Sequence, residues 1–204
     1  MIRRLLPSVV IVVALSSAAG LVRAGDSWPS FRGADGTGRA LEVLPPGEGP
    51  LSLKLRWKRE LGSGYSGLSL AEGVLVTVFA EGDRDVVVAL DPGSGEEQWR
   101  HDLAPVYVGH DGSSNGSIAT PAIADGRVFV LGSWGHLVAL DVRAGAALWR
   151  THVVDDLGGE KPHYGFGGSP LIVGDTLVLP IGGQGGAVAG FDVATGEVRW
   201  RSVE

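Results

Sequence analysis

Two glycine-rich stretches carry letter patterns that are associated with nucleotide binding or hydrolysis. Residues 62–67 (Gly-Ser-Gly-Tyr-Ser-Gly) match G-x-G-x-x-G, and residues 112–116 (Gly-Ser-Ser-Asn-Gly) match G-x-S-x-G. Both chemistries need a helix directly after the turn, because the helix N-terminus binds the phosphate or the strained turn exposes the serine. The residues that follow each stretch are typical of strands instead. Both stretches are therefore predicted to be loops between strands, without a nucleotide site or a catalytic triad.

The histidines and the lack of cysteine limit metal and nucleophile chemistry further. The chain has five histidines and no cysteine, which excludes disulfides, thiolate metal sites and a cysteine nucleophile. No two histidines have the H-x-x-x-H or H-E-x-x-H spacing that builds a zinc site on one element. The sequence therefore predicts no catalytic residue and no metal site.

Two histidines stand in equivalent places in the longest connections, residues 102–118 and 154–168. His110 lies 11 residues before Pro121, and His163 lies 7 residues before Pro170. Aromatic, acidic and amide side chains accompany them, a mixture that suits a polar ligand or a peptide. A solvated loop without a ligand is the open alternative. The candidate residues for a ligand or partner face are His110, Asp111, Asn115, His163, Tyr164 and Phe166.

Composition indicates which elements position these loops. Glycine makes up 33 of the 204 residues, well above the usual share of about 7%. Glycine and β-branched residues recur too often for long helices, while 44% hydrophobic residues provide a core and argue against disorder. A turn-rich β protein is predicted. The formal net charge of −6 makes a nucleic-acid partner unexpected.

The first 24 residues have the features of a secretory signal peptide. Arg3 and Arg4 precede an apolar stretch from Leu5 to Leu15, and Val22-Arg23-Ala24 fits the export peptidase. The apolar stretch is shorter than the ~20 residues that a spanning helix needs, so no transmembrane anchor is predicted. A lipoprotein anchor would require a cysteine. We expect cleavage before Gly25 and a periplasmic or secreted protein.

A repeat occupies the remainder of the chain. Three segments, 89–99, 139–149 and 190–200, align without gaps. In each segment a glycine lies four residues after an aspartate, and a tryptophan lies four residues after that glycine. Trp57 resembles the end of an earlier copy. A helical repeat of this period would need amphipathic stretches of ten or more residues, which are absent. The shared positions are Gly95 with Trp99, Gly145 with Trp149, and Gly196 with Trp200.

Each copy has room for four short strands. Between Pro121 and Trp149 these are expected at about 119–124, 127–133, 136–141 and 146–153. Four antiparallel strands every 40–50 residues make a β-propeller blade. The fold prediction is all-β, a propeller of four-stranded antiparallel blades. In that fold, residues 102–118 and 154–168 lead into the innermost strands and meet at the channel mouth.

The Ala-x-Asp-x-x-x-Gly-x-x-x-Trp pattern resembles the tryptophan-docking motif of propellers of the pyrroloquinoline-quinone (PQQ) type. This superfamily includes PQQ dehydrogenases and the outer-membrane assembly propeller of the Bam complex. The opening Trp28-Pro-Ser-Phe-Arg-Gly33 is similar to the start of exported PQQ-like repeat proteins. The resemblance implies that each motif tryptophan packs between neighbouring blades, near the motif glycine and alanine. The third copy departs by having Gly190 in the alanine position.

The resemblance also implies an organisation and two possible functions. The segments are a signal peptide (1–24), an N-terminal segment (25–56) and blades at about 57–101, 102–152 and 153–204. PQQ-like propellers usually close with seven or eight blades, so further blades of this chain or another chain are expected to complete the ring. The favoured function is a non-catalytic binding or scaffold module for envelope or exported proteins, with no cofactor. The alternative is part of a PQQ-dependent alcohol or sugar dehydrogenase, with PQQ and calcium.

Overall fold

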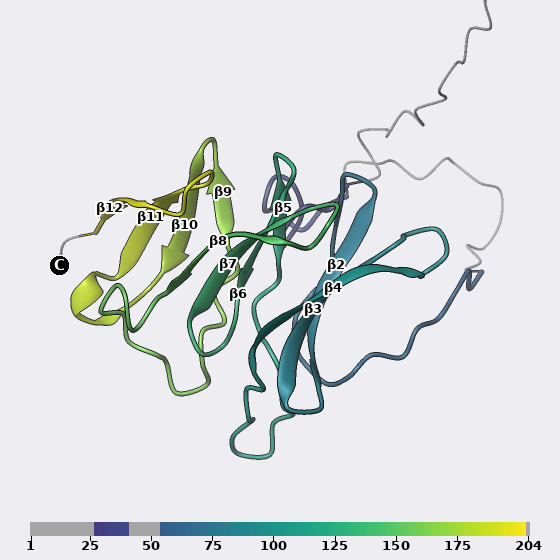
Figure 1. Ribbon diagram of the computed structural model, residues 1–204, viewed down its shortest axis with the longest axis horizontal. Coiled ribbons are helices and arrows are strands. Elements are labelled where there is room, and N and C mark those ends of the chain that lie inside the picture. The colour runs from purple at the N-terminus through teal and green to yellow at the C-terminus, as the bar shows by residue number, and fades with distance from the viewer. Residues whose placement is uncertain (1–26, 41–53, 203–204) are drawn as a thin grey trace, which may run out of the picture.

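The computed structural model describes residues 27–40 and 54–202. The predicted signal peptide, the cleavage site before Gly25 and part of the N-terminal segment lie outside the described residues. Within them the chain forms three four-stranded antiparallel sheets that stand side by side (Figure 1). This confirms the predicted all-β fold with four-stranded blades. No helix in the described ranges has the length and apolar character needed to cross a membrane.

Each sheet is formed by consecutive strands in chain order, so every blade is a simple meander. Blade 1 contains β1 (Ser69–Ala71), β2 (Val74–Glu81), β3 (Arg84–Leu90) and β4 (Glu97–Pro105). Blade 2 contains β5 (Ala122–Ala124), β6 (Arg127–Leu131), β7 (His136–Asp141) and β8 (Ala147–His152). Blade 3 contains β9 (Leu171–Val173), β10 (Thr176–Pro180), β11 (Val188–Asp192) and β12 (Val198–Arg201), with a 3-10 turn, η1 (Gly183–Gly185), between β10 and β11. The four strands predicted for blade 2 match β5 to β8 closely.

The hydrophobic core lies between the sheets. One cluster joins blades 1 and 2, with Val76 and Val87 packed with Val130 and Leu140. A second cluster joins blades 2 and 3, with Phe129 and Leu177 among its fully buried members. Strands of mainly Val, Leu and Ala form these sheets because such side chains interdigitate between two pleated surfaces.

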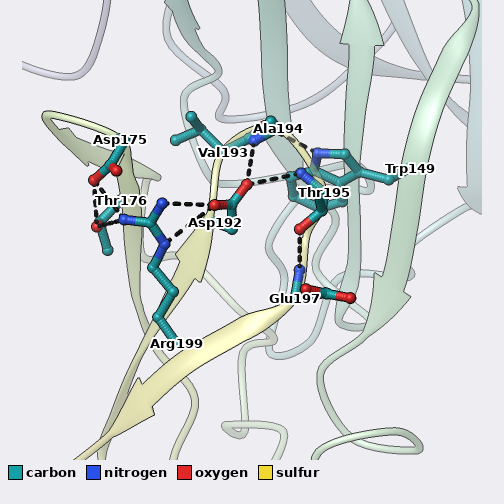
Figure 2. Close-up of polar contacts among 9 residues, drawn as sticks. All are labelled: Trp149, Asp175, Thr176, Asp192, Val193, Ala194, Thr195, Glu197 and Arg199. Atoms are coloured by element: carbon teal, nitrogen blue, oxygen red, sulfur yellow. Dashed lines mark hydrogen bonds and ion pairs between the residues drawn. The ribbon is translucent and has the colours of Figure 1, made fainter.

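The motif aspartate and glycine of each copy form a tight turn. The Oδ1 atom of Asp192 accepts hydrogen bonds from the backbone N–H groups of Ala194 (2.8 Å) and Thr195 (2.9 Å), as Figure 2 shows. The N–H of Gly196 bonds back to the carbonyl of Asp192 at 2.8 Å, with Gly196 at φ +76°. Asp91 and Asp141 make the same bonds in their copies. The tight turn of each copy therefore requires an aspartate four residues before a glycine.

The turn of one blade receives the tryptophan of the preceding blade. The Trp99 indole donates to the carbonyl of Val142 at 2.9 Å and lies over Gly145. The Trp149 indole likewise donates to the carbonyl of Val193 at 3.0 Å (Figure 2). It lies over Gly196. Each tryptophan thus closes the contact between two sheets, as the resemblance implies.

Trp57 and Trp200 mark the two sides of the described blades. Trp57 donates to the carbonyl of Pro92 at 3.0 Å and lies over Gly95, so it docks on blade 1 as the end of an earlier copy would. Trp200 is 44% exposed and packs on Gly190, its cross-strand partner. A Cβ at position 190 would overlap the indole, which gives a physical reason for glycine where the other copies have alanine. Docking of Trp200 on a further blade remains a prediction.

The N-terminal segment attaches to the innermost strands. Trp28 pairs with Leu70 of β1 through two backbone hydrogen bonds of 2.6 and 2.9 Å. The carbonyl of Pro29 accepts from the N–H of Ile123 in β5 at 2.8 Å. Residues 27–40, drawn in purple in Figure 1, lie beside β5. This segment therefore links the inner edges of blades 1 and 2.

Candidate functional site

The loops between β4 and β5 and between β8 and β9 meet at one end of blades 1 and 2. The rings of His110 and His163 stack with centroids 5.4 Å apart and planes at 29°. The Tyr164 hydroxyl donates to Oδ2 of Asp111 at 3.2 Å, and Nε2 of His163 lies 3.5 Å from the same oxygen. Four of the six predicted site residues, His110, Asp111, His163 and Tyr164, are thus brought together. We call these four residues the loop face.

The loop face is open to solvent. The side chains of Asp111 and His163 are 70% and 68% exposed, and Tyr164 is 53% exposed. Contacts between groups exposed to this degree contribute little to folding, because water competes for them. Asp111 also has φ +53°, a conformation that aspartate tolerates but rarely adopts. The arrangement therefore offers donors, an acceptor and flat rings to a partner without being needed for the core.

An aromatic and cationic layer supports the loop face. Tyr107 is buried, and its hydroxyl donates to the carbonyl of His163 at 3.2 Å. The Tyr107 ring contacts the ring of Trp134 edge-on at 5.0 Å. The Lys161 ammonium lies 5.5 Å from the Trp134 ring centroid, within cation–π range. Trp134 was not singled out in the sequence, because it lies outside both loops, in the turn between β6 and β7.

Asn115 and Phe166 have structural roles. The Asn115 side chain accepts from the N–H of Gly109 at 3.0 Å and so closes its own loop. Phe166 is 3% exposed, belongs to the core between blades 2 and 3, and packs against Gly135. Gly165, which precedes Phe166, allows close contact with the Ser133 backbone. Phe166 is therefore enclosed in the core, whereas Asn115 is exposed and its side-chain oxygen is engaged within its own loop.

The two glycine-rich motifs hold the first loop in place. Ser63 bridges to Ala80 of β2, and no helix follows residues 62–67 or 112–116. The Tyr65 hydroxyl accepts from the N–H of Ser114 at 2.8 Å, which ties the two motifs together. The predicted loop assignment is therefore confirmed for both stretches.

A buried carboxyl group lies at the root of the first loop. Asp85 of β3 is 0% exposed, and its Oδ2 accepts from the Ser117 hydroxyl at 3.0 Å. Its Oδ1 has no hydrogen-bond partner in the described part of the chain. Burial raises the pKa of Asp85, and the hydrogen bond from Ser117 offsets only part of this effect. The carboxyl group therefore holds its proton to a higher pH than an exposed aspartate does.

Replacing Asp85 with Asn is expected to raise the melting temperature of the full-length protein at pH 7 by about 2–4 °C. The folded state holds the Asp85 proton to a higher pH than the unfolded chain does, where the pKa is about 3.9. The contribution of this group to the free energy of unfolding is fully present below the pKa of Asp85 in the unfolded chain. It is lost as pH rises through the higher pKa of Asp85 in the folded state. The melting temperatures of the wild type and of Asp85→Asn should therefore differ less at pH 4 than at pH 7. The same difference at both values would contradict this assignment.

The acidic and histidine side chains of the described residues are dispersed. Within residues 27–40 and 54–202, no three His, Asp or Glu side chains are grouped so as to hold a metal ion. These ranges therefore contribute no group of three acidic or histidine side chains to the calcium site that the resemblance implies for PQQ enzymes. The loop face can bind through hydrogen bonds, ring contacts and charge.

Comparisons with known proteins relate these blades to two groups. A family model described as outer membrane protein assembly factor BamB matches residues 48–203. The chain is 32% identical over 120 residues to the quinohemoprotein alcohol dehydrogenase ADH IIB of Pseudomonas putida, covering 56% of this chain and 17% of that enzyme. It is 28% identical over 160 residues to the dehydrogenase subunit of a quinone-type alcohol dehydrogenase of Gluconacetobacter polyoxogenes, covering 74% and 21%.

A solved structure gives the same relation. The quinohemoprotein alcohol dehydrogenase ADHIIG of Pseudomonas putida aligns with a TM-score of 0.50 and 25% identity, over 71% of this chain and 21% of the enzyme. The chain thus spans about a fifth of the length of these dehydrogenases. With three stacked four-stranded sheets, repeated docking turns and a family match over residues 48–203, the chain belongs to the family of PQQ-like β-propeller repeat proteins described by the outer-membrane assembly factor BamB.

Proposed function

We propose that this chain is part of an exported, periplasmic propeller that acts as a non-catalytic binding or scaffold module in the cell envelope. The proposal rests on the loop face, because loops that follow two different blades meet there and present their side chains to solvent together. Its exposed His163, Asp111 and Tyr164 side chains offer charge, hydrogen bonds and a flat apolar surface. Such a mixture suits a polypeptide partner, another envelope or exported protein. The assembly-factor description of the family supports the location and the role.

The dehydrogenase relatives support a second candidate. Two curated relatives are alcohol dehydrogenases of the quinone or quinohemoprotein type, so the complete protein could hold PQQ with calcium. When bound, PQQ would accept the electrons of an alcohol. Within the described residues no three His, Asp or Glu side chains are grouped as its calcium site would need, whereas the loop face is formed. The binding role is therefore favoured.

A double substitution of the loop face tests the proposal. In the full-length protein, Asp111→Asn with Tyr164→Ala removes the charge and the ring while leaving the core intact. Periplasmic partners captured by the wild type should be lost or reduced about tenfold with this variant, since a few central contacts dominate binding. Asp125→Asn is the matched control, because Asp125 is also exposed, has φ +49° and lies at the opposite end of β5.

Two outcomes would overturn this assignment. Equal capture by the wild type and the double variant would exclude the loop face as the binding surface. A calcium-dependent absorbance change on adding PQQ to the full-length protein would favour the dehydrogenase candidate instead. Retention of a partner by the wild type and Asp125→Asn, with loss in the double variant, supports the proposal.

A further inference from the structure

A groove of about 270 Å³ lies between blades 1 and 2, at their outer rim. Its walls are β4 of blade 1, β7 and β8 of blade 2, and the turn that follows β8. We call it the rim groove. It shares no residue with the loop face, and β4 and β8 are the last strands of their sheets.

The floor of the rim groove is apolar. Leu103, Leu137 and Val138 line it, and they are 8%, 0% and 4% exposed. Their packing is fixed, because Leu103 and Val138 belong to the core between blades 1 and 2. A floor of this kind favours the methylene stem of a ligand over water.

Three of the five histidines line the same groove. The rings of His136 and His152 contact each other edge-on, with centroids 4.6 Å apart. Burial and, second, the neighbouring His152 lower the pKa of His136; burial and then Arg150 lower the pKa of His101. Both rings are therefore neutral at pH 7. The Nδ1 atom of His136 is buried and has no hydrogen-bond partner within the described ranges.

The charges of the groove are unbalanced. Asp102, Asp155 and Asp156 line it together with one cation, Arg150. Asp156 accepts from the N–H of His152 at 2.7 Å and from the Thr151 hydroxyl at 3.1 Å, which lowers its pKa and keeps it ionised. Asp155 lies 3.1 Å from Nδ1 of His152. With the imidazoles of His101 and His136 neutral, three carboxylates against one lining guanidinium leave an excess of negative charge above an apolar floor.

We propose that the rim groove binds a guanidinium or primary ammonium group carried on an aliphatic stem, as in an arginine or lysine side chain. The stem would lie on Leu103 and Val138, and the cation would approach the carboxylates of Asp155 and Asp102. Arg150 forms no ion pair with the described residues. Its positive charge therefore repels a cationic ligand and lowers the affinity of the groove for it. This site is independent of the loop face and of its role.

Matched ligands test the charge requirement. The full-length protein is titrated with a short capped peptide containing one arginine and with the same peptide containing citrulline, and binding is followed by NMR. The arginine peptide should bind with a dissociation constant of ~1 mM, a usual value for a single side chain, and citrulline at least fivefold more weakly. N-Butylguanidine, a free alkylguanidine with a single positive charge, separates the side-chain chemistry from the peptide backbone. It should bind as well as the peptide does if the backbone contributes nothing.

Variants of opposite sign test the location. Asp155→Asn should weaken binding of the arginine peptide about two- to fivefold, the usual effect of one partly exposed charge pair. Arg150→Gln should strengthen binding by a similar factor, because it removes the repelling cation. Neither residue is in the core, so both variants should fold. Asp125→Asn, outside the groove, should leave binding unchanged.

The affinity should also fall as pH decreases from 7.5 to 5.5. Protonation of His136 or His101 adds positive charge to the groove, where Arg150 already opposes a cation and Arg84 acts on His136 from outside the lining. The proposal is overturned if citrulline binds as well as arginine, or if no shifts occur at 20 mM peptide, about twentyfold above the expected dissociation constant. Weaker binding by Arg150→Gln would also overturn it. So would Zn²⁺ perturbing the groove histidines while the arginine peptide leaves them unchanged.

Discussion

Replacing Trp99 with Ala is expected to lower the free energy of unfolding of the full-length protein by about 3–5 kcal/mol. Trp99 is 7% exposed, lies in the core between blades 1 and 2, and donates its indole hydrogen bond to Val142. Truncation removes this apolar contact, leaves a cavity between two sheets and leaves a carbonyl group without its donor. Thermal and urea unfolding of the purified variant measure the loss.

Trp200→Ala provides the matched control. It removes the same side chain from the same motif position, but Trp200 is 44% exposed and packs only on its own blade within the described structure. If a further blade covers Trp200 in the full-length protein, its truncation should be nearly as damaging as that of Trp99. If none does, the loss should stay below about 1 kcal/mol, as for exposed substitutions. An unchanged melting temperature for Trp99→Ala would refute the docking role itself.

The parts of the fold that the sequence predicted are those built from local chemistry. The Asp-to-Gly spacing specifies an aspartate-capped turn, which arises from bonds within four residues of Asp91, Asp141 and Asp192. The strands of blade 2 were predicted for the same reason, since glycine turns and runs of Val and Leu are local signals. The contact of each docked tryptophan with a glycine of the next blade is long-range, and the repeated spacing together with the family resemblance predicted it. The three-blade arrangement then follows from repetition.

The candidate site depended on contacts between distant residues and was predicted less completely. Equivalent loop positions pointed correctly to the meeting of His110 with His163, which are 53 residues apart. The burial of Phe166 depends on Gly135 in blade 2, and the support from Trp134 depends on Tyr107 in the loop after blade 1. The rim groove collects His101, His136 and His152 from three separate strands. No spacing within one element encodes such a set.

The second large effect is expected for Gly145→Ala, which should destabilise the full-length protein by about 2–5 kcal/mol. Two costs combine at this position. Gly145 has φ +66°, where a side chain costs about 1–2 kcal/mol. A Cβ there would also stand 2.5 Å from the Trp99 ring, an overlap that displaces the docked indole and costs roughly 1–3 kcal/mol.

Gly126→Ala separates the two costs. Gly126 has φ +73° in the turn between β5 and β6, and a Cβ there would meet no atom within 4 Å. It therefore carries the backbone strain alone, and its unfolding free energy should fall by about 1–2 kcal/mol. The double variant Gly145→Ala with Trp99→Ala completes the argument, because removing the indole also removes the overlap. In that background the effect of Gly145→Ala should shrink to the value measured at Gly126. Equal effects of Gly145→Ala with and without Trp99 would show that the motif glycine serves only the turn, and not the packing of one blade on the next.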